Sequence, residues 1–184
     1  GGEVCLIGVL TREGDTSPRG LMFKWASMRG IFVGSRGMAE RLNAFIDANY
    51  LSVLIESFNK HPDCGCIGGP ILLHYEDIKP SWENLYLNSL LGYFNKGEAA
   101  FYFNRTDYPR GSNMAFRNLV FEKAGVFNVT LGRIGNNLFG GEEKDQFNRI
   151  YEAEIPVLYE PRAIVHHCVP RERTTFTFIK KQAL

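Results

Sequence analysis

From residue 51 to the C-terminus, segments with the period of an α-helix alternate with short apolar segments. Apolar residues between Leu51 and Phe58 recur at positions i, i+3, i+4 and i+7, which is the spacing of one helix face. This helix should end near Pro62, because a residue that precedes proline disfavours the helical conformation. The next apolar segment, Cys66–Leu73, predicts a short buried strand interrupted by glycines. Helices and strands that alternate in this order predict an α/β fold.

The other elements continue this alternation, and no change of composition marks a second domain. The patterns predict a strand at Val4–Leu10, a helix with a stripe from Trp82 to Tyr93, a strand at Phe101–Phe103, a helix at Met114–Ala124 closed by Gly125, a helix at Glu142–Tyr151, and strands at Ile155–Glu160 and Ala163–His167. We therefore expect one domain, with residues 1–50 as a segment that is hard to interpret and residues 51–184 as its regular part.

Composition narrows the class of protein further. The chain has 184 residues, 45% of them hydrophobic, and 21 Lys+Arg against 20 Asp+Glu give a net charge of +1. A protein whose main task is to hold nucleic acid needs a broad basic surface, so this balance argues against nucleic acid as a partner. Val4–Leu10 is far shorter than the roughly 20 apolar residues that cross a bilayer, and it lacks the flanks of a secretory signal. Four cysteines form no disulfide framework, so we expect a reducing, cytoplasmic location.

An acidic cluster follows a pair of glycines at the start of one predicted helix. Gly140 and Gly141 allow the chain to approach a ligand closely, and Glu142, Glu143 and Asp145 come next. Carboxylates at a helix N-terminus are stabilised by the helix dipole, and an ion pair from Asp145 to the residue four positions on would serve the helix alone. The other interpretation is that one of the adjacent glutamates is a general base.

A polar segment precedes the predicted 114–124 helix. Arg110, Ser112 and Asn113 around Gly111 suit the recognition of sugar hydroxyls or phosphate, although Ser112 or Asn113 equally suits the N-cap of the following helix. Near the end of the chain, His166 and His167 must point to opposite faces of a strand, so at most one serves a given site.

Two further hypotheses concern the remaining polar residues. Arg171 and Arg173 either neutralise a diphosphate or belong to a solvated tail. A zinc site at His61, Cys64, Cys66 and His74 is a weaker hypothesis, because a second ligand pair at the usual spacing is missing.

Several of these segments together, in their order, resemble the family 2 glycosyltransferases of the GT-A fold. The resemblance extends from about Leu51 to the C-terminus and rests on GGP (68–70), RGSNMAFR (110–117), FEKAGVFN (121–128), GGEEKDQFNR (140–149) and YEPRAIVHH (159–167). It implies an open, twisted, Rossmann-like sheet flanked by helices, which in this chain would be incomplete. It also implies an enzyme that transfers a sugar from a nucleotide-sugar donor with inversion at the anomeric carbon.

The resemblance assigns roles to individual residues. The acidic pair of the family falls on Glu142 and Glu143; the second member is the usual base, which favours Glu143 and leaves Glu142 as the alternative. The family's strand-end histidine falls on His167, which would help to bind the metal or the diphosphate. Arg110, Gly111, Asn113, Asp145 and Arg173 are the expected substrate-binding residues.

Residues 1–50 depart from the family pattern. Where a metal-binding Asp-x-Asp is expected, the chain has Asp47-Ala-Asn49, and asparagine brings no charge, so Mn²⁺ or Mg²⁺ would bind more weakly. The alternative is that residues 41–49 simply extend the following helix. The nucleotide-binding segment of the family is not visible either, so we expect an atypical, truncated or misread N-terminus.

These departures leave two functions open. The first is a glycosyltransferase of bacterial surface polysaccharide or glycoconjugate synthesis, with a glycan or lipid-linked acceptor, at the cytoplasmic face of a membrane. The aromatic helix expected at Trp82–Phe94 would cover the acceptor site or touch the membrane, although such a stripe more often belongs to the core. The second is a non-catalytic remnant, or carbohydrate-binding module, that keeps the acceptor half of the fold.

Overall fold

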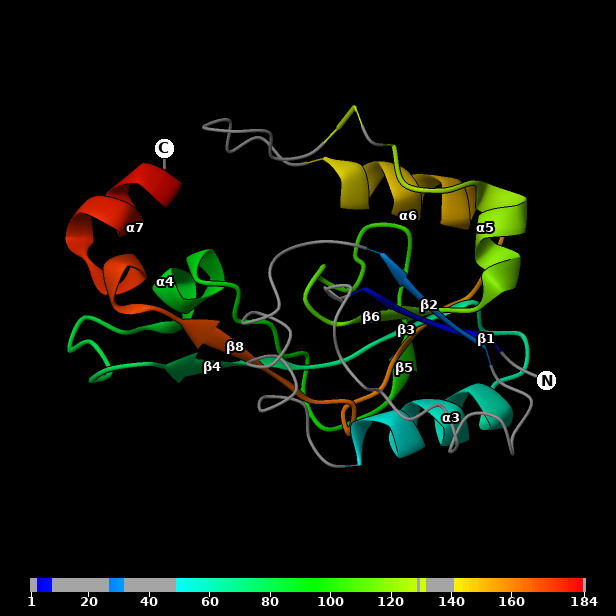
Figure 1. Cartoon of the computed structure of the whole chain (residues 1–184), viewed down its shortest axis with the longest axis horizontal. Helices are drawn as coiled ribbons and strands as arrows, with labels where there is room; N and C mark the ends of the chain where they lie inside the picture. The colour runs from blue at the N-terminus through cyan, green and yellow to red at the C-terminus, as the bar shows by residue number, and fades with distance from the viewer. Residues whose placement is uncertain (1–2, 8–26, 32–48, 129, 132–140, 184) are drawn as a thin grey trace.

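The computed structural model describes residues 3–7, 27–31, 49–128, 130–131 and 141–183, and for the first two ranges only the backbone. Its centre is a six-stranded sheet in the order β2-β1-β6-β3-β7-β5 (Figure 1). Four strands run in one direction, and β6 and β5 run antiparallel to them. The strands are β1 (Glu3–Ile7), β2 (Ser27–Ile31), β3 (Cys66–Gly68), β5 (Phe101–Tyr102), β6 (Met114–Phe116) and β7 (Val157–Tyr159).

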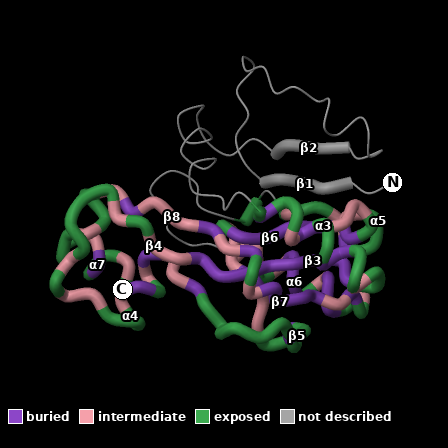
Figure 2. Tube along the Cα trace, turned by 90° about the horizontal axis from the view of Figure 1, so that it is seen from below, coloured by how far each residue is buried: buried purple, intermediate pink, exposed green. Residues whose placement is uncertain are grey.

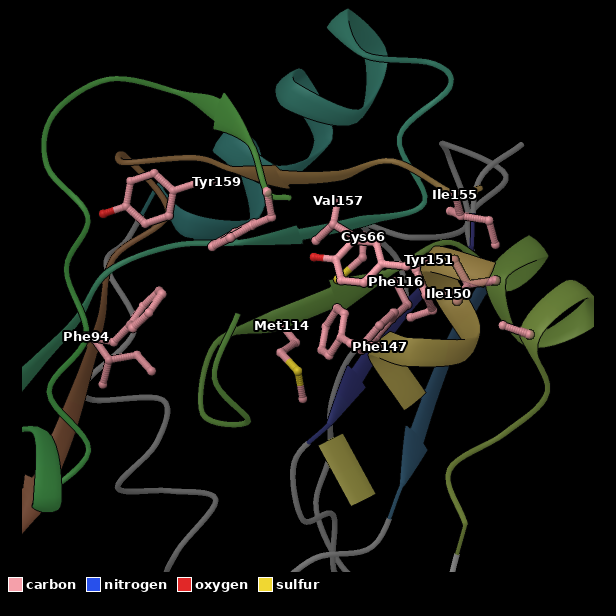
Figure 3. Packing of buried hydrophobic residues seen from close by; sticks show 14 residues of the cluster. Cys66, Phe94, Met114, Phe116, Phe147, Ile150, Tyr151, Ile155, Val157 and Tyr159 are labelled. Atoms are coloured by element: carbon pink, nitrogen blue, oxygen red, sulfur yellow. The ribbon is translucent and has the colours of Figure 1, made fainter. Parts of the chain in front are cut away.

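Helices cover both faces of this sheet. Alternate residues of a strand point to opposite faces, and in β3 the side chain of Cys66 joins one hydrophobic cluster while that of Ile67 joins the other. On one face α3 (Tyr50–Lys60) contributes Leu54 to the cluster that contains Ile67. On the other face lie α5 (Asn118–Ala124) and α6 (Glu142–Glu152), whose side chains pack against the aromatic cluster in Figure 3. The molecule therefore has the layered α/β fold that the sequence predicts.

A second, smaller unit extends from one end of the large sheet (Figure 1). Here β4 (Ile71–Tyr75) and β8 (Val165–Val169) form a two-stranded parallel sheet. It packs with α4 (Leu85–Leu90), the 3₁₀ helix η1 (Arg171–Thr174) and α7 (Phe176–Ala183). We call residues 71–91 and 165–183 the distal lobe.

The large sheet and the distal lobe are joined where two parallel strands change sheet. The chain passes from β3 to β4 through Gly69-Pro70 and from β7 to β8 through residues 160–164. A Cβ atom at Gly69 would overlap the carbonyl oxygens of Glu160 and Ala163, so only glycine fits there. The buried Asn113 side chain donates to the carbonyls of Pro70 (2.9 Å) and Ala163 (2.7 Å), and thereby fills the gap between the separating strands.

Several predicted boundaries are corrected by this arrangement. The helix expected at residues 114–124 is wrong in its first part, because Met114–Phe116 is a buried strand between β1 and β3 and the helix begins at Asn118. Gly125 ends that helix with a φ of 73°, as predicted. The helix expected around Trp82 to Tyr93 is shorter, because the Asn84 side chain caps it by accepting from Leu87 N. Of the strand expected at Val4–Leu10, residues 8–10 lie outside the described part.

Candidate active site

The N-terminus of α6 holds three carboxylates in three different environments. Glu142 accepts a hydrogen bond from the backbone N–H of Gly141 (2.8 Å), so it caps its own helix. Asp145 accepts from Arg149 Nη2 (2.9 Å), which confirms the i,i+4 ion pair. Glu143 instead faces the 107–111 loop, where a Cβ atom at Gly111 would overlap its Oε1. The structure thus brings together two segments that the sequence singled out separately.

The 107–111 loop lies along one face of α6 in the antiparallel direction. Four residues after Glu143, the ring of Phe147 stacks on Tyr108 with centroids 5.1 Å apart. Four residues later again, Tyr151 donates from its hydroxyl to the carbonyl of Asp107 (2.6 Å). Burial raises the pKa of Tyr151, so its hydroxyl keeps the proton it donates. These contacts hold the 107–111 loop against α6, and the Glu143 carboxylate lies beside the backbone of Gly111.

Sequence reasoning missed the purpose of this helix face. Phe147 and Tyr151 belong to the buried cluster and also contact the 107–111 loop, a second role that the sequence analysis did not consider. The spacing of four from Glu143 was the available signal, since residues at i, i+4 and i+8 lie along one side of a helix. The residues that these side chains contact in the 107–111 loop show no regular spacing in the sequence.

Arg110 is held beside this contact between two aromatic rings. Its guanidinium carbon lies 4.9 Å from the ring centre of Phe94 and 4.8 Å from that of Tyr108. Nη1 donates to the carbonyl of Tyr108 (2.8 Å), and Nη2 lies 3.4 Å from Asp107 Oδ1. Asp107 also pairs with Lys96 (2.6 Å). With 43% of its side chain exposed, Arg110 presents a positioned guanidinium that suits phosphate or carboxylate groups.

Asn113, in contrast, is engaged inside the protein. Besides its two bonds to backbone carbonyls, its Oδ1 accepts from the hydroxyl of Tyr50 (2.8 Å), and its side chain is buried. These bonds give Asn113 a structural role, and its expected contact with substrate stays a prediction.

His167 and Arg173 lie in the distal lobe. His167 pairs with Leu73 in the β4–β8 ladder, and its ring lies over Gly92. Burial, and then the nearby charge of Arg173, lowers the pKa of His167, so its imidazole is neutral at pH 7. Arg173, in η1, is exposed and contacts the ring of Phe178. The structure therefore places these two candidates near each other.

The expected metal ligands are only partly within the described residues. Asp47 lies outside them, and Asn49 is an exposed residue directly before α3. Across the described ranges, three or more His, Cys, Asp or Glu side chains nowhere converge as a metal site would require. The Mn²⁺ or Mg²⁺ site therefore stays a prediction.

The zinc hypothesis is wrong, because its four residues are described and do not form a site. The thiol of Cys64 donates to the carbonyl of Cys66 (3.0 Å), and burial raises its pKa to about 11, which opposes the thiolate that zinc needs. His61 Nδ1 instead pairs with the hydroxyl of Tyr102 (2.8 Å).

Comparison with known proteins supports the sugar-transfer interpretation. No protein-family model matches the chain. The chain is 25% identical over 138 residues to a glucosyl-dolichyl phosphate glucuronosyltransferase of Haloferax volcanii. The similarity covers 74% of this chain and 44% of that relative, so the chain spans less than half of its length. A distant relative of this protein is therefore a glycosyltransferase, and the α/β fold described above is compatible with that activity.

Proposed function

We propose that this chain is the acceptor-side part of a glycosyltransferase that moves a sugar from a nucleotide-sugar donor to an acceptor hydroxyl with inversion. The observation that carries the proposal is the position of Glu143, which the 107–111 loop and the rigid α6 hold in place. Similarity to a glycosyltransferase over 138 residues supports it independently.

In this mechanism Glu143 is the general base. Its carboxylate takes the proton of the acceptor hydroxyl while the oxygen attacks the anomeric carbon, and the bond from that carbon to the diphosphate breaks. Glu142, which accepts a hydrogen bond from Gly141, is the alternative candidate, because the second member of the acidic pair is the usual base in the family that the sequence resembles. Arg110, at the edge of the same loop, would bind an anionic group of donor or acceptor, and Arg173 remains a candidate for the diphosphate. Asp145 would act mainly through its ion pair with Arg149.

A lipid-linked acceptor fits this proposal best, because the relative is named for a glucosyl-dolichyl phosphate. We place the reaction at the cytoplasmic face of a membrane, in the synthesis of a glycoconjugate or surface polysaccharide. A divalent cation, Mn²⁺ or Mg²⁺, would neutralise the diphosphate leaving group when bound. The described residues do not assemble its site, so the steps above use only the protein's own side chains.

The test is transfer from UDP- and GDP-sugars to a glucosylated polyprenyl phosphate, followed by mass spectrometry, with and without Mn²⁺. We expect Glu143→Gln to lower the rate by about 10²–10⁴-fold, because general-base catalysis contributes this much. Donor binding, measured by calorimetry, should hardly change.

Glu142→Gln is the matched control, since it alters the adjacent carboxylate and should leave most activity. Equal losses in both variants would contradict the assignment of the base. Binding of sugars without transfer by the wild-type protein would favour the carbohydrate-binding module instead.

A further inference from the structure

The distal lobe exposes large apolar side chains to an unusual degree. Five large hydrophobic side chains of the described residues are more than two thirds exposed, and four of them belong to this lobe. The four have exposed fractions between 68% and 85%: Ile78, Leu85, Tyr86 and Phe176. The fifth, Val126, lies near the end of α5. Single exposed apolar residues are ordinary, but a concentration of them indicates a binding surface.

These side chains lie at one end of the molecule, on elements that pack together. Figure 1 shows α4 and α7 side by side beyond β4 and β8, away from α3, α5 and α6. The ring of Trp82 lies 6.0 Å from that of Phe176, which links the segment before α4 to the start of α7. Ile179, one turn further along α7, is buried in the small hydrophobic cluster of the lobe. Thus Ile179 anchors α7 in the lobe, whereas Phe176 is 71% exposed. Figure 2 shows in green how much of the chain around α4 and α7 is exposed.

Basic residues accompany this apolar surface. Residues 171–183 contain a net charge of +3, from Arg171, Arg173, Lys180 and Lys181 against Glu172. Residues 71–91 have a net charge of −2, so the lobe as a whole is +1 and its positive charge is concentrated in η1 and α7. Arg171 lies 3.6 Å from Asp77, and Lys79 pairs with Glu83, so these charges are partly balanced. Lys180 and Lys181, in the last turn of α7, are exposed. Basic residues close to exposed apolar side chains favour binding to an anionic membrane surface.

We propose that the distal lobe docks on the surface of an anionic lipid bilayer. Ile78, Leu85, Tyr86 and Phe176 enter the headgroup region, and Lys180 and Lys181 face the lipid phosphates. A bilayer suits this surface better than a protein partner, because lysine is depleted in protein–protein interfaces whereas it is attracted to anionic headgroups. The proposal deepens the proposed function, since a lipid-linked acceptor resides in a membrane. Vesicle binding can nevertheless be measured without any transfer reaction.

The experiment is flotation of the protein with vesicles made of equal parts of phosphatidylglycerol and phosphatidylcholine, compared with vesicles of phosphatidylcholine alone. We expect the wild-type protein to float with the anionic vesicles and to be released by high salt. Lys180→Gln combined with Lys181→Gln should weaken binding about tenfold or more, because each basic residue near such a surface contributes substantially. Leu85→Ser combined with Phe176→Ser should weaken binding to a similar extent.

Val126→Ser is the matched control, because Val126 is 71% exposed like Phe176 but lies outside the lobe; it should bind as the wild type does. Circular dichroism verifies that the variants are folded. Absence of wild-type flotation with anionic vesicles would overturn the proposal. A dimer that light scattering detects and Phe176→Ser dissociates, without flotation, would assign the face to a second copy and overturn it as well. Flotation without sugar transfer would support the membrane surface and contradict only the proposed function.

Discussion

The large sheet and the distal lobe differ in how much hydrophobic surface they bury. In the large sheet, β3, β6 and β7 are buried along their whole length, and helices cover both faces. The distal lobe has only three fully buried hydrophobic side chains in its cluster, those of Leu91, Val169 and Ile179. A core of that size contributes little by itself, so the lobe depends on the strands that continue into it from the large sheet. The large sheet can therefore position a catalytic group, while the lobe keeps its apolar residues available for binding.

The junction between these two regions should be the most sensitive point. Asn113→Ala removes donors from the carbonyls of Pro70 and Ala163 and the acceptor of the Tyr50 hydroxyl, and it leaves these groups buried without partners. We expect a loss of about 2–4 kcal/mol in the free energy of unfolding, measured by urea denaturation. The transition should stay single, because the lobe does not fold independently.

Tyr50→Phe is the control for Asn113→Ala, since it removes only one of these hydrogen bonds and should cost about 1 kcal/mol. If Asn113→Ala costs no more than Tyr50→Phe, the junction is not held by this side chain. If the lobe of the wild-type protein unfolds in a separate transition at lower urea concentration, the lobe does not depend on the large sheet as we infer.

Gly111→Ala should change the position of the Glu143 carboxylate without much effect on the stability of the protein. In Gly111→Ala the new Cβ overlaps Oε1 of Glu143, which is the end of a flexible side chain and can turn away. Stability should change by less than about 1 kcal/mol, whereas displacement of the carboxylate by about 1 Å should lower the rate of sugar transfer by about 10²-fold. Both are measured on the same preparation. Binding to vesicles should stay unchanged, because Gly111 lies outside the lobe, beside Glu143 of α6.

Gly141→Ala is the matched control for this substitution. A Cβ atom at Gly141 meets no atom within 4 Å among the described residues, and Gly141 has an extended φ of 170°. This variant should retain its activity. Full activity in Gly111→Ala would show that the contact between the loop and Glu143 does not position the base.

Much of the fold was predictable, because local patterns decide it. The helical period from Leu51 to Phe58 identified α3. Glycines were expected to interrupt the strand at Cys66–Leu73, and the structure confirms this, because β3 ends at Gly68 and β4 begins at Ile71. The strand Met114–Phe116 was not predictable, since three residues show too little periodicity and their pairing with β1 and β3 is a long-range choice. The separation of Cys66–Leu73 into two strands in different sheets depends on the same kind of distant partner.

The candidate site divides in a similar way. The sequence identified Glu143 and Arg110 as candidates in two separate segments. Only the fold shows that these two segments lie next to each other. The sequence also indicated Asn113, yet the chemistry of asparagine is the same whether it contacts a ligand or the backbone. Its position at the strand junction, 50 residues from Ala163 along the chain, is what brings its side chain to the backbone carbonyls. Long-range contacts of this type are not encoded in local spacing.

The smallest expected effect is a loss of stability at low pH, and it tests how α3 is held to the large sheet. Ser57 of α3 donates to Glu160 (2.5 Å), and Arg162 forms charged hydrogen bonds with the same carboxylate (3.0 Å). Burial alone would raise the pKa of Glu160, but these bonds outweigh it and lower the pKa to about 2. The unfolded chain thus binds the proton more tightly, so stability from Glu160 is fully present above about pH 4.5 and is lost as the pH falls towards 2. Because Arg162 is half exposed, and also pairs with Glu56, solvent screens part of this interaction and we expect about 1–2 kcal/mol.

Urea denaturation at a series of pH values between 7 and 3 measures this effect. Glu160→Gln should be less stable than the wild type at pH 7, and the difference should shrink as the pH falls. Glu56→Gln is the control, because Glu56 is exposed and contacts only the outer side of Arg162. An unchanged difference at pH 3 would mean that the carboxylate charge of Glu160 does not hold α3 to the sheet. Apolar packing would then hold α3 to the large sheet, as it holds the helices of the distal lobe. The two regions would differ in the size of their hydrophobic cores, whereas the kind of contact that stabilises them would be the same.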